Sequence, residues 1–219
     1  MHDSVQKLIH IEKLVKSKEA NLKKSEASKI IAVSKTFSLD KIMPLINHGH
    51  YDYGENKVQE ALDKWTQLKI EKPELKLHLV GKLQTNKVKF AIKLFDFIHS
   101  VDSKKLAKKI YEEQSNQNKQ VKIFLQVNIG NEEQKSGVLK SDLNDLYYYC
   151  KDLKLDVVGL MCIPPFSSDP NPFFQDLNNL NKNLNLKELS MGMSSDYLKA
   201  IENHSTYLRI GSAIFGERI

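Results

Sequence analysis

Cysteine is scarce in this chain of 219 residues, which contains only Cys150 and Cys162. Two cysteines are too few for a disulfide framework, and their spacing is not that of a metal site. We therefore expect two ordinary buried thiols in a reducing compartment, which favours the cytoplasm. We predict no metal site.

Long apolar runs are also missing. Residues 1–19 carry charges throughout and space their apolar side chains as a helix does, so we predict neither a signal peptide nor a membrane partner. We find no internal repeat and no low-complexity linker. With 41% hydrophobic residues, the chain is long enough to bury one core, and we expect a single domain over residues 1–219.

Acidic residues are outnumbered by basic ones, 27 against 33, which gives a net charge of +6. Such an excess raises the question of nucleic-acid binding. The lysines, however, are spread along the chain and alternate with Asp and Glu, and aromatic residues are not interleaved with them for stacking on bases. We therefore expect a solvated, lysine-rich surface that attracts small anions and has no nucleic-acid partner.

What the sequence does contain is an alternation of short β-branched runs with longer segments of helical periodicity. This pattern is typical of parallel strands joined by crossover helices. An additional helix over about Asp3–Lys24 precedes the strands and is expected to cover the place of an eighth outer helix, because the last strand lies close to Ile219. Eight strands with this rhythm predict a single TIM-type (β/α)8 barrel, of the α/β class. The predicted strands are Lys29–Ser34, His50–Tyr53, Leu77–Val80, Phe97–Val101, Val121–Asn128, Leu155–Met161, Glu188–Met191 and Thr206–Ile210.

Lys35 is the first candidate for chemistry. It follows the apolar strand at Ile30–Val33, so its amine is expected at the carboxyl-terminal mouth of the barrel, where barrel enzymes place their reactive groups. Desolvation there would lower the pKa of a lysine and favour the neutral amine that attacks an aldehyde. Taken alone, an ordinary surface lysine at a strand end is the favoured explanation, because the chain has 33 Lys and Arg residues.

Two segments near the end of the chain suggest an anion site. Ser194 follows the seventh predicted strand, and Gly211 and Ser212 follow the eighth. Barrels commonly bind phosphate in these two loops. We expect Ser194 to cap a helix at Ser195–Asn203 and to offer its hydroxyl to an anion, while Gly211 lets the backbone approach closely. A helix cap and a turn glycine are the structural alternatives.

Other polar residues end strands at the same expected rim. Arg209 lies near the end of an apolar strand, where a guanidinium is costly without a partner such as a ring nitrogen or a carboxylate. An ion pair with Asp196 is the structural alternative. Asn56 and Asn86 follow the second and third strands and are expected either to cap helices or to contact a ligand. His78 alternates with leucines, which favours a satisfied core histidine over a catalytic base.

Seven segments carry a resemblance that covers nearly the whole chain. They are AVSKT at 32–36, GENKVQE at 54–60, HLVGKLQTNK at 78–87, QVNIGNEEQKSG at 126–137, GLMCIPP at 159–165, LSMGMSSD at 189–196 and RIGSAIFGER at 209–218. In this order they resemble the PLP-binding homeostasis protein family, the pyridoxal 5'-phosphate (PLP) binding relatives of the alanine racemase barrel. The resemblance implies PLP-dependent fold type III without the C-terminal β-domain of alanine racemase.

The resemblance also implies roles for individual residues. Lys35 would form a Schiff base with PLP, Ser194 and the amides of Gly211 and Ser212 would hold its phosphate, and Arg209 would face its pyridine nitrogen. A guanidinium keeps that nitrogen unprotonated, which leaves the ring a weak electron sink and disfavours carbanion chemistry. No residue is predicted to be catalytic. The residues implied to contact PLP are Lys35, Asn56, Met193, Ser194, Arg209, Gly211 and Ser212.

The function implied by the resemblance is intracellular PLP homeostasis, by buffering or delivery of the cofactor, with consequent effects on amino-acid and keto-acid balance. PLP-dependent apo-enzymes are the implied recipients, no robust catalytic activity is expected, and the protein is expected to be a monomer. A weak PLP-dependent amino-acid racemase is the enzymatic alternative, but it needs a second base, which alanine racemases take from a domain not expected here. A cofactor-free barrel that binds nucleic acid in a salt-sensitive way is the third interpretation.

Overall fold

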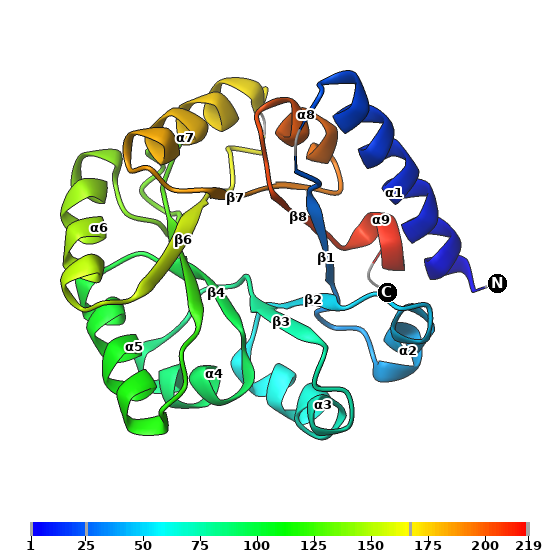
Figure 1. Ribbon diagram of the computed structural model, residues 1–219, viewed down its shortest axis with the longest axis horizontal. Coiled ribbons are helices and arrows are strands. Elements are labelled where there is room, and N and C mark those ends of the chain that lie inside the picture. The colour runs from blue at the N-terminus through cyan, green and yellow to red at the C-terminus, as the bar shows by residue number, and fades with distance from the viewer. Residues whose placement is uncertain (1, 25, 167, 218–219) are drawn as a thin grey trace.

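Eight parallel strands form a closed barrel in the computed structural model, which describes residues 2–24, 26–166 and 168–217. The strands pair in sequence order, and β1 closes the barrel by pairing with both β2 and β8 (Figure 1). The predicted TIM-type barrel is confirmed, and a strand forms at each predicted place except that the second is displaced along the chain. The strands are β1 (Lys29–Val33), β2 (Asp52–Glu55), β3 (Lys76–Leu79), β4 (Phe97–Val101), β5 (Lys122–Gln126), β6 (Asp156–Met161), β7 (Glu188–Met193) and β8 (Tyr207–Ile210).

Helices surround the strands (Figure 1). Their apolar side chains pack against the outside of the barrel. In α3, for example, Val58, Ala61, Trp65 and Leu68 recur every three or four residues and are all buried, as expected for one face of a helix. The helices are α1 (Asp3–Asn21), α2 (Leu39–Asn47), α3 (Val58–Glu71), α4 (Val88–Leu94), α5 (Lys104–Gln117), α6 (Leu143–Asp152), α7 (Asn171–Asn183), α8 (Tyr197–Glu202) and α9 (Ser212–Phe215), with 3-10 turns η1 (Thr85–Lys87) and η2 (Lys140–Asp142).

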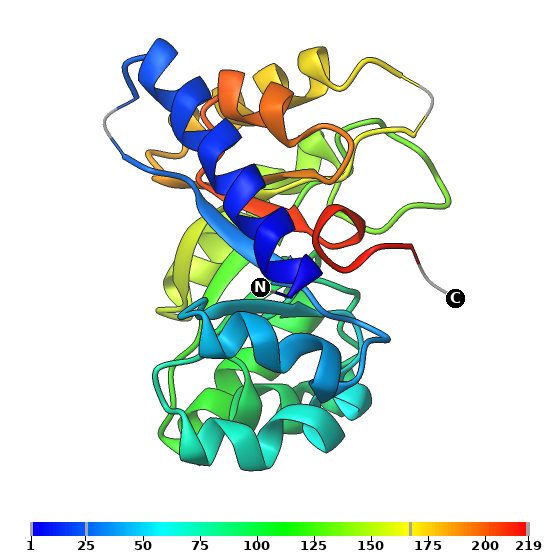
Figure 2. The same cartoon turned by 90° about the vertical axis from the view of Figure 1, so that its right-hand side faces the viewer.

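The N-terminal helix covers the outside of the barrel beside the last strand. Helix α1 contacts α2, α8 and α9, and Figure 2 shows it crossing the face nearest the viewer. Its apolar side chains Val5, Leu8, Ile11 and Val15 are buried in this contact layer. Helix α9 is a single turn, so α1 covers the position that a full eighth helix would occupy, as predicted. Arg218 and Ile219 lie outside the described residues.

The interior of the barrel is filled by side chains from alternate strand positions. Ile31 and Val33 of β1 point inward, whereas Ile30 and Ala32 belong to the outer core beneath the helices. This alternation is the two-residue period of a strand. The inner apolar cluster consists of Ile31, Val33, Phe97, Phe124, Met161 and Tyr207.

The second strand is displaced from its predicted position. The prediction was His50–Tyr53, but β2 spans Asp52–Glu55, and Gly54 and Glu55 lie in the strand rather than in the loop that follows it. Glycine is unfavourable inside a strand, which is why the sequence pattern suggested a turn there. Here the missing side chain has a packing reason, since a Cβ on Gly54 would lie 2.9 Å from Ile31 Cγ2.

Both cysteines are free and buried, as predicted. Burial raises the pKa of each thiol to about 12. Within the described residues, no three or more His, Cys, Asp or Glu side chains are placed to hold a metal ion. The helices of the described part of the chain are too short or too polar to cross a membrane.

Candidate functional site

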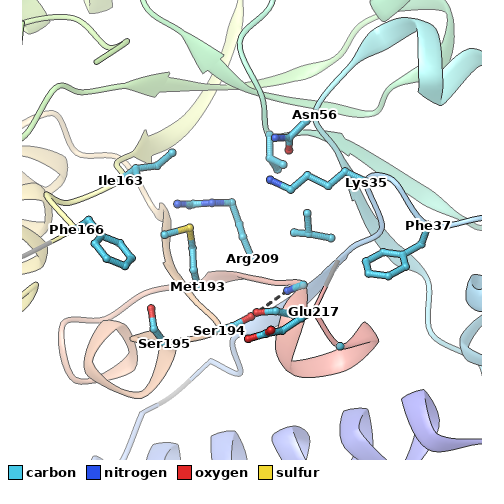
Figure 3. A pocket seen from close by; sticks show the side chains of 15 residues that line it. Lys35, Phe37, Asn56, Ile163, Phe166, Met193, Ser194, Ser195, Arg209 and Glu217 are labelled. Carbon is cyan, nitrogen blue, oxygen red and sulfur yellow. Dashed lines mark hydrogen bonds between the residues drawn. The ribbon is translucent and has the colours of Figure 1, made fainter. Parts of the chain in front are cut away.

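A cavity of about 710 Å³ opens at the carboxyl ends of the strands (Figure 3). Its lining residues lie at or just after the carboxyl ends of β1, β2, β3, β6, β7 and β8, so they come from six of the eight strands of the barrel. The structure thus brings all seven residues of the predicted site into one cavity. These residues are Lys35, Asn56, Met193, Ser194, Arg209, Gly211 and Ser212.

Lys35 reaches into the cavity from the turn that follows β1. The side chain is half-buried, and Figure 3 shows its amine beside Asn56 and on the same side of the cavity as the Arg209 guanidinium. Asn56 is held close to the rim because the β3 loop packs tightly on its backbone, and a Cβ on Gly81 would lie 2.3 Å from the Asn56 carbonyl oxygen. An amine and an amide therefore form one wall of the cavity.

Ser194 has a different local role from the one predicted. Helix α8 begins at Tyr197 with Asp196 as its N-cap, so the prediction that Ser194 caps this helix is wrong. Its Oγ instead accepts hydrogen bonds from the amides of Gly211 and Ala213, each at 3.2 Å. A hydroxyl that accepts two hydrogen bonds still has its own hydrogen to donate. Ser194 therefore joins the β7 end to the β8 turn and retains a donor for a ligand.

The capping alternative for the two asparagines is also wrong. Lys57, not Asn56, is the N-cap of α3, and Asn86 lies inside η1. Asn56 lines the cavity, whereas Asn86 is exposed on the outside of its turn. Of the two roles that the sequence left open, ligand contact is the one compatible with the position of Asn56.

Arg209 is buried at the floor of the cavity, with 5% of its surface exposed. Its Nη1 donates to Ser190 Oγ at 2.7 Å and its Nη2 to the Cys162 carbonyl oxygen at 2.8 Å. The alternative ion pair with Asp196 is not formed, and Asp196 instead accepts a hydrogen bond from the Met193 amide. Burial lowers the pKa of the guanidinium, but arginine remains charged in proteins. A buried, permanently charged donor thus faces the cavity.

A chain of buried polar side chains runs from Arg209 through the barrel interior. Ser190 Oγ lies 2.8 Å from His99 Nδ1, and His99 Nε2 lies 3.0 Å from His78 Nδ1. His78 Nε2 then contacts Asp52 Oδ1 at 2.9 Å, at the amino-terminal end of β2. The prediction that His78 is a satisfied core histidine is confirmed. This role of His99 and Ser190 was not predicted from the sequence. His99 is two residues after Phe97 in β4, so both side chains point to the barrel interior.

Burial lowers the pKa of both histidines in this chain. For His99, the neighbouring His78 and the Arg209 charge lower the pKa further. Each ring also stacks on a phenylalanine, His78 on Phe97 and His99 on Phe124, with centroids 4.3 Å apart in both pairs. Both imidazoles are therefore neutral at physiological pH.

This neutrality predicts a pH dependence of stability. The pKa of each histidine is lower in the folded chain than in the unfolded chain, where it is about 6.5. The stabilisation is therefore complete above that pH and is lost as pH falls toward the pKa of the folded chain. We expect the free energy of unfolding to decrease between pH 7 and pH 5, by at most about 1.4 kcal/mol per pH unit for each histidine. Urea unfolding over this range measures it.

The matched comparison uses two glutamine variants. His99→Gln should reduce the pH slope, because one of the protons taken up on unfolding is lost. His10→Gln, at an exposed position on α1, should leave the slope unchanged. A stability that does not vary between pH 7 and pH 5, or an unchanged slope in His99→Gln, would contradict the assignment of neutral histidines.

The sequence did not identify about half of the cavity lining. Strand parity could have identified Val33 and Val80, which continue the inward-facing positions of the first and third predicted strands and pack with the inner cluster. The others lie in loops, where periodicity carries no information about direction. The lining residues that were not predicted are Val33, Phe37, Val80, Ile163, Phe166, Ser195, Gly216 and Glu217.

Comparison with known proteins shows the class to which this barrel belongs. Residues 11–219 match the family described as alanine racemase, N-terminal domain. The chain is 38% identical over 218 residues to the pyridoxal phosphate homeostasis protein of Aquifex aeolicus (strain VF5), with 95% of each chain covered. It is 40% identical over 211 residues to the Homo sapiens protein of the same name, covering 87% of this chain and 76% of that one. The chain therefore belongs to the pyridoxal phosphate homeostasis proteins within the alanine racemase N-terminal domain family.

A solved structure of the same kind supports this assignment. PipY of Synechococcus elongatus PCC7942, described with PLP bound, is 32% identical and superposes with a TM-score of 0.81. The match covers 92% of this chain and 100% of the PipY chain. The similarity thus extends over the strands that form the cavity.

Proposed function

We propose that this protein binds PLP in the cavity at the barrel mouth, with Lys35 as the Schiff-base residue, and serves PLP homeostasis by buffering or delivering the cofactor. The observation that carries the proposal is the convergence of an amine, a hydroxyl and a buried guanidinium, from Lys35, Ser194 and Arg209, on one cavity. The PLP bound by the related PipY supports the same choice of ligand.

The residues of the cavity fit the chemical groups of PLP. PLP supplies an aldehyde that condenses with a primary amine, and it also carries a phosphate and a pyridine nitrogen. Lys35 provides the amine, Ser194 a hydroxyl donor, and Arg209 a donor that suits an unprotonated ring nitrogen. The cavity volume of about 710 Å³ is within the usual range for small-molecule sites.

The phosphate donors are assigned to the turn between β8 and α9. The Gly211 amide already donates to Ser194 Oγ, so we assign the Ser194 hydroxyl hydrogen and the Ser212 amide as direct donors. Ser212 is the first residue of α9, and first-turn amides have no partner within their helix. Glycine at position 211 lets this turn lie close to β1, because a Cβ there would lie only 3.2 Å from the Val33 carbonyl oxygen.

Arg209 favours a carrier over a strong catalyst. Its guanidinium donates hydrogen bonds and does not release a proton, so it holds the ring nitrogen in the unprotonated form. An unprotonated ring withdraws electrons weakly, which disfavours carbanion formation. A weak amino-acid racemase therefore ranks below PLP storage, and a cofactor-free nucleic-acid-binding barrel ranks last.

We further propose that the protein acts as a monomer in the cytoplasm and that PLP-dependent apo-enzymes receive the cofactor from it. The two free, buried cysteines support a reducing compartment, because neither is paired. A monomer would leave the barrel mouth open to solvent and hence to a recipient. Effects on amino-acid and keto-acid balance would follow from the supply of PLP to those enzymes.

Comparing PLP with pyridoxal, which lacks the phosphate, tests the proposal. We expect PLP to bind at least about 100-fold more tightly by absorbance titration, because charge-assisted hydrogen bonds to phosphate are lost with pyridoxal. Ser194→Ala should weaken PLP binding much more than pyridoxal binding, so pyridoxal is the internal control for the change in the turn itself. Equal affinities for the two aldehydes would contradict the assigned phosphate site.

A further inference from the structure

The turn that carries Lys35 contains a strained residue. Thr36 has φ of 68°, in the left-handed region, where a β-branched residue is a genuine outlier. The Phe37 amide donates to the Ser34 carbonyl oxygen at 3.2 Å, which closes a β-turn with Thr36 at its third position. Positive φ at that position normally requires Gly or Asn. A conformation of this kind persists only where the surroundings hold it.

The contact that holds Thr36 comes from helix α3. Glu60 Oε1 accepts a hydrogen bond from the Thr36 amide at 2.5 Å. Lys64, one helical turn further along, lies 3.2 Å from the same carboxylate oxygen and donates to the Ser34 carbonyl oxygen at 3.0 Å. Burial opposes the charge of Glu60, but the hydrogen bonds from Thr36 and Lys64 lower its pKa overall. Hydrogen bonds from α3 therefore hold the backbone on both sides of Lys35, at the Ser34 carbonyl and at the Thr36 amide.

Lys64 is itself fixed by a buried carboxylate. Glu55 is fully buried at the end of β2, and its Oε1 accepts from Lys64 Nζ at 2.9 Å, from Ser34 Oγ at 2.8 Å and from Trp65 Nε1 at 2.9 Å. The Lys64 side chain is 9% exposed, and Ser34, Glu55 and Glu60 provide three acceptors for the three hydrogens of its ammonium. The network therefore ties the ends of β1 and β2 to α3 as one unit.

We propose that Glu60 and Lys64 are positioning residues that hold the Lys35 turn in its strained form and so direct the amine into the cavity. The inference rests on the proposed function of Lys35. Neither residue is among the described residues that line the cavity, so both act through the backbone. Without the Glu60 contact, Thr36 relaxes to negative φ, which reorients the peptide groups beside Lys35 and turns its side chain from the cavity.

Glu60 variants test this inference by PLP affinity, measured well below the unfolding temperature. We expect Glu60→Ala to weaken PLP binding about tenfold, or about 1.4 kcal/mol. Glu60→Gln keeps a carbonyl acceptor for the Thr36 amide and should stay within about threefold of wild type. A purely structural role for Glu60 would lower the unfolding temperature and leave the affinity of the folded protein unchanged.

Removing the strain supplies a rescue experiment. Glycine adopts positive φ without a penalty, so Thr36→Gly in the Glu60→Ala background should restore most of the lost affinity. A cofactor-free measurement accompanies it, because the Thr36 amide of the apo-protein should exchange its hydrogen faster in Glu60→Ala than in wild type. Asp63→Asn is the matched control, at an exposed position of the same helix that contacts Gln59, and should change neither quantity.

The outcomes separate this inference from the proposed function. If wild type binds PLP on Lys35 but Glu60→Ala binds it with the same affinity, the positioning role is overturned and the proposed function stands. Failure of Thr36→Gly to restore affinity would also overturn it, since the strain would not be what Glu60 controls. If wild type forms no Schiff base on Lys35, the proposed function fails and this inference with it.

Discussion

Lys35→Ala is expected to abolish the change in visible absorbance that PLP undergoes on binding to the wild-type protein. The variant lacks the amine that we propose bonds to the aldehyde, so the remaining contacts of the cavity would hold PLP only noncovalently. We expect the affinity to fall by at least about 100-fold, because the covalent link and the orientation that it imposes are both lost. Titration of each protein with PLP, followed by absorbance, measures both effects.

Lys41→Ala is the matched control for this experiment, since Lys41 is an exposed lysine of α2 on the next element of the chain. It should titrate as the wild type does. The folded state of Lys35→Ala can be checked by circular dichroism and urea unfolding, because Lys35 is only half-buried. A full absorbance change in Lys35→Ala would place the Schiff base on another lysine.

Arg209→Met has the second-largest expected effect, because it should lower both the free energy of unfolding and the affinity for PLP. The substitution removes the donor to the buried Cys162 carbonyl oxygen, and an unsatisfied buried acceptor costs about 1–3 kcal/mol. We therefore expect the free energy of unfolding to decrease by about 2 kcal/mol. Lys35 remains, so PLP should still bind covalently, but about tenfold more weakly because the hydrogen bond to the ring nitrogen is lost.

A spectroscopic measurement isolates the role of Arg209 at the ring. If Arg209 faces the pyridine nitrogen as proposed, its guanidinium prevents protonation of that nitrogen in the wild type, whereas in Arg209→Met the nitrogen is free to titrate. We expect a pH-dependent change in the absorbance of bound PLP in the variant that the wild type lacks. Arg209→Lys is the matched control, because lysine keeps the positive charge but not the forked geometry of the guanidinium. The pH-dependent change in its absorbance should lie between those of the wild type and Arg209→Met. Identical pH profiles in all three proteins would remove Arg209 from the ring nitrogen.

Much of the architecture was predictable from the sequence, because a closed parallel barrel puts the carboxyl ends of all its strands at one rim. Once Lys35, Asn56, Ser194 and Arg209 were placed at strand ends, their convergence followed from topology rather than from any local pattern. The slip of β2 by two residues shows the limit of this reasoning. Gly54 suggests a turn locally, but packing against Ile31 keeps it in the strand.

Contacts between elements distant in sequence could not be predicted. Glu60 and Thr36 are 24 residues apart, and His99 and Ser190 are 91 residues apart, yet both pairs make hydrogen bonds in the structure. Hydrophobic periodicity gives the inward face of an element but not the partner that each side chain meets across the barrel. For the same reason, Ser194 was expected to cap the following helix, whereas its hydroxyl accepts hydrogen bonds from the next strand's turn.

The most direct test of the account is borohydride reduction of the wild-type protein with bound PLP, followed by peptide mapping. Reduction fixes a Schiff base as a stable secondary amine, so the modified lysine is identified by the mass of its peptide. We expect one phosphopyridoxyl group, on Lys35. A label distributed over exposed lysines, or a single label on another lysine, would contradict it.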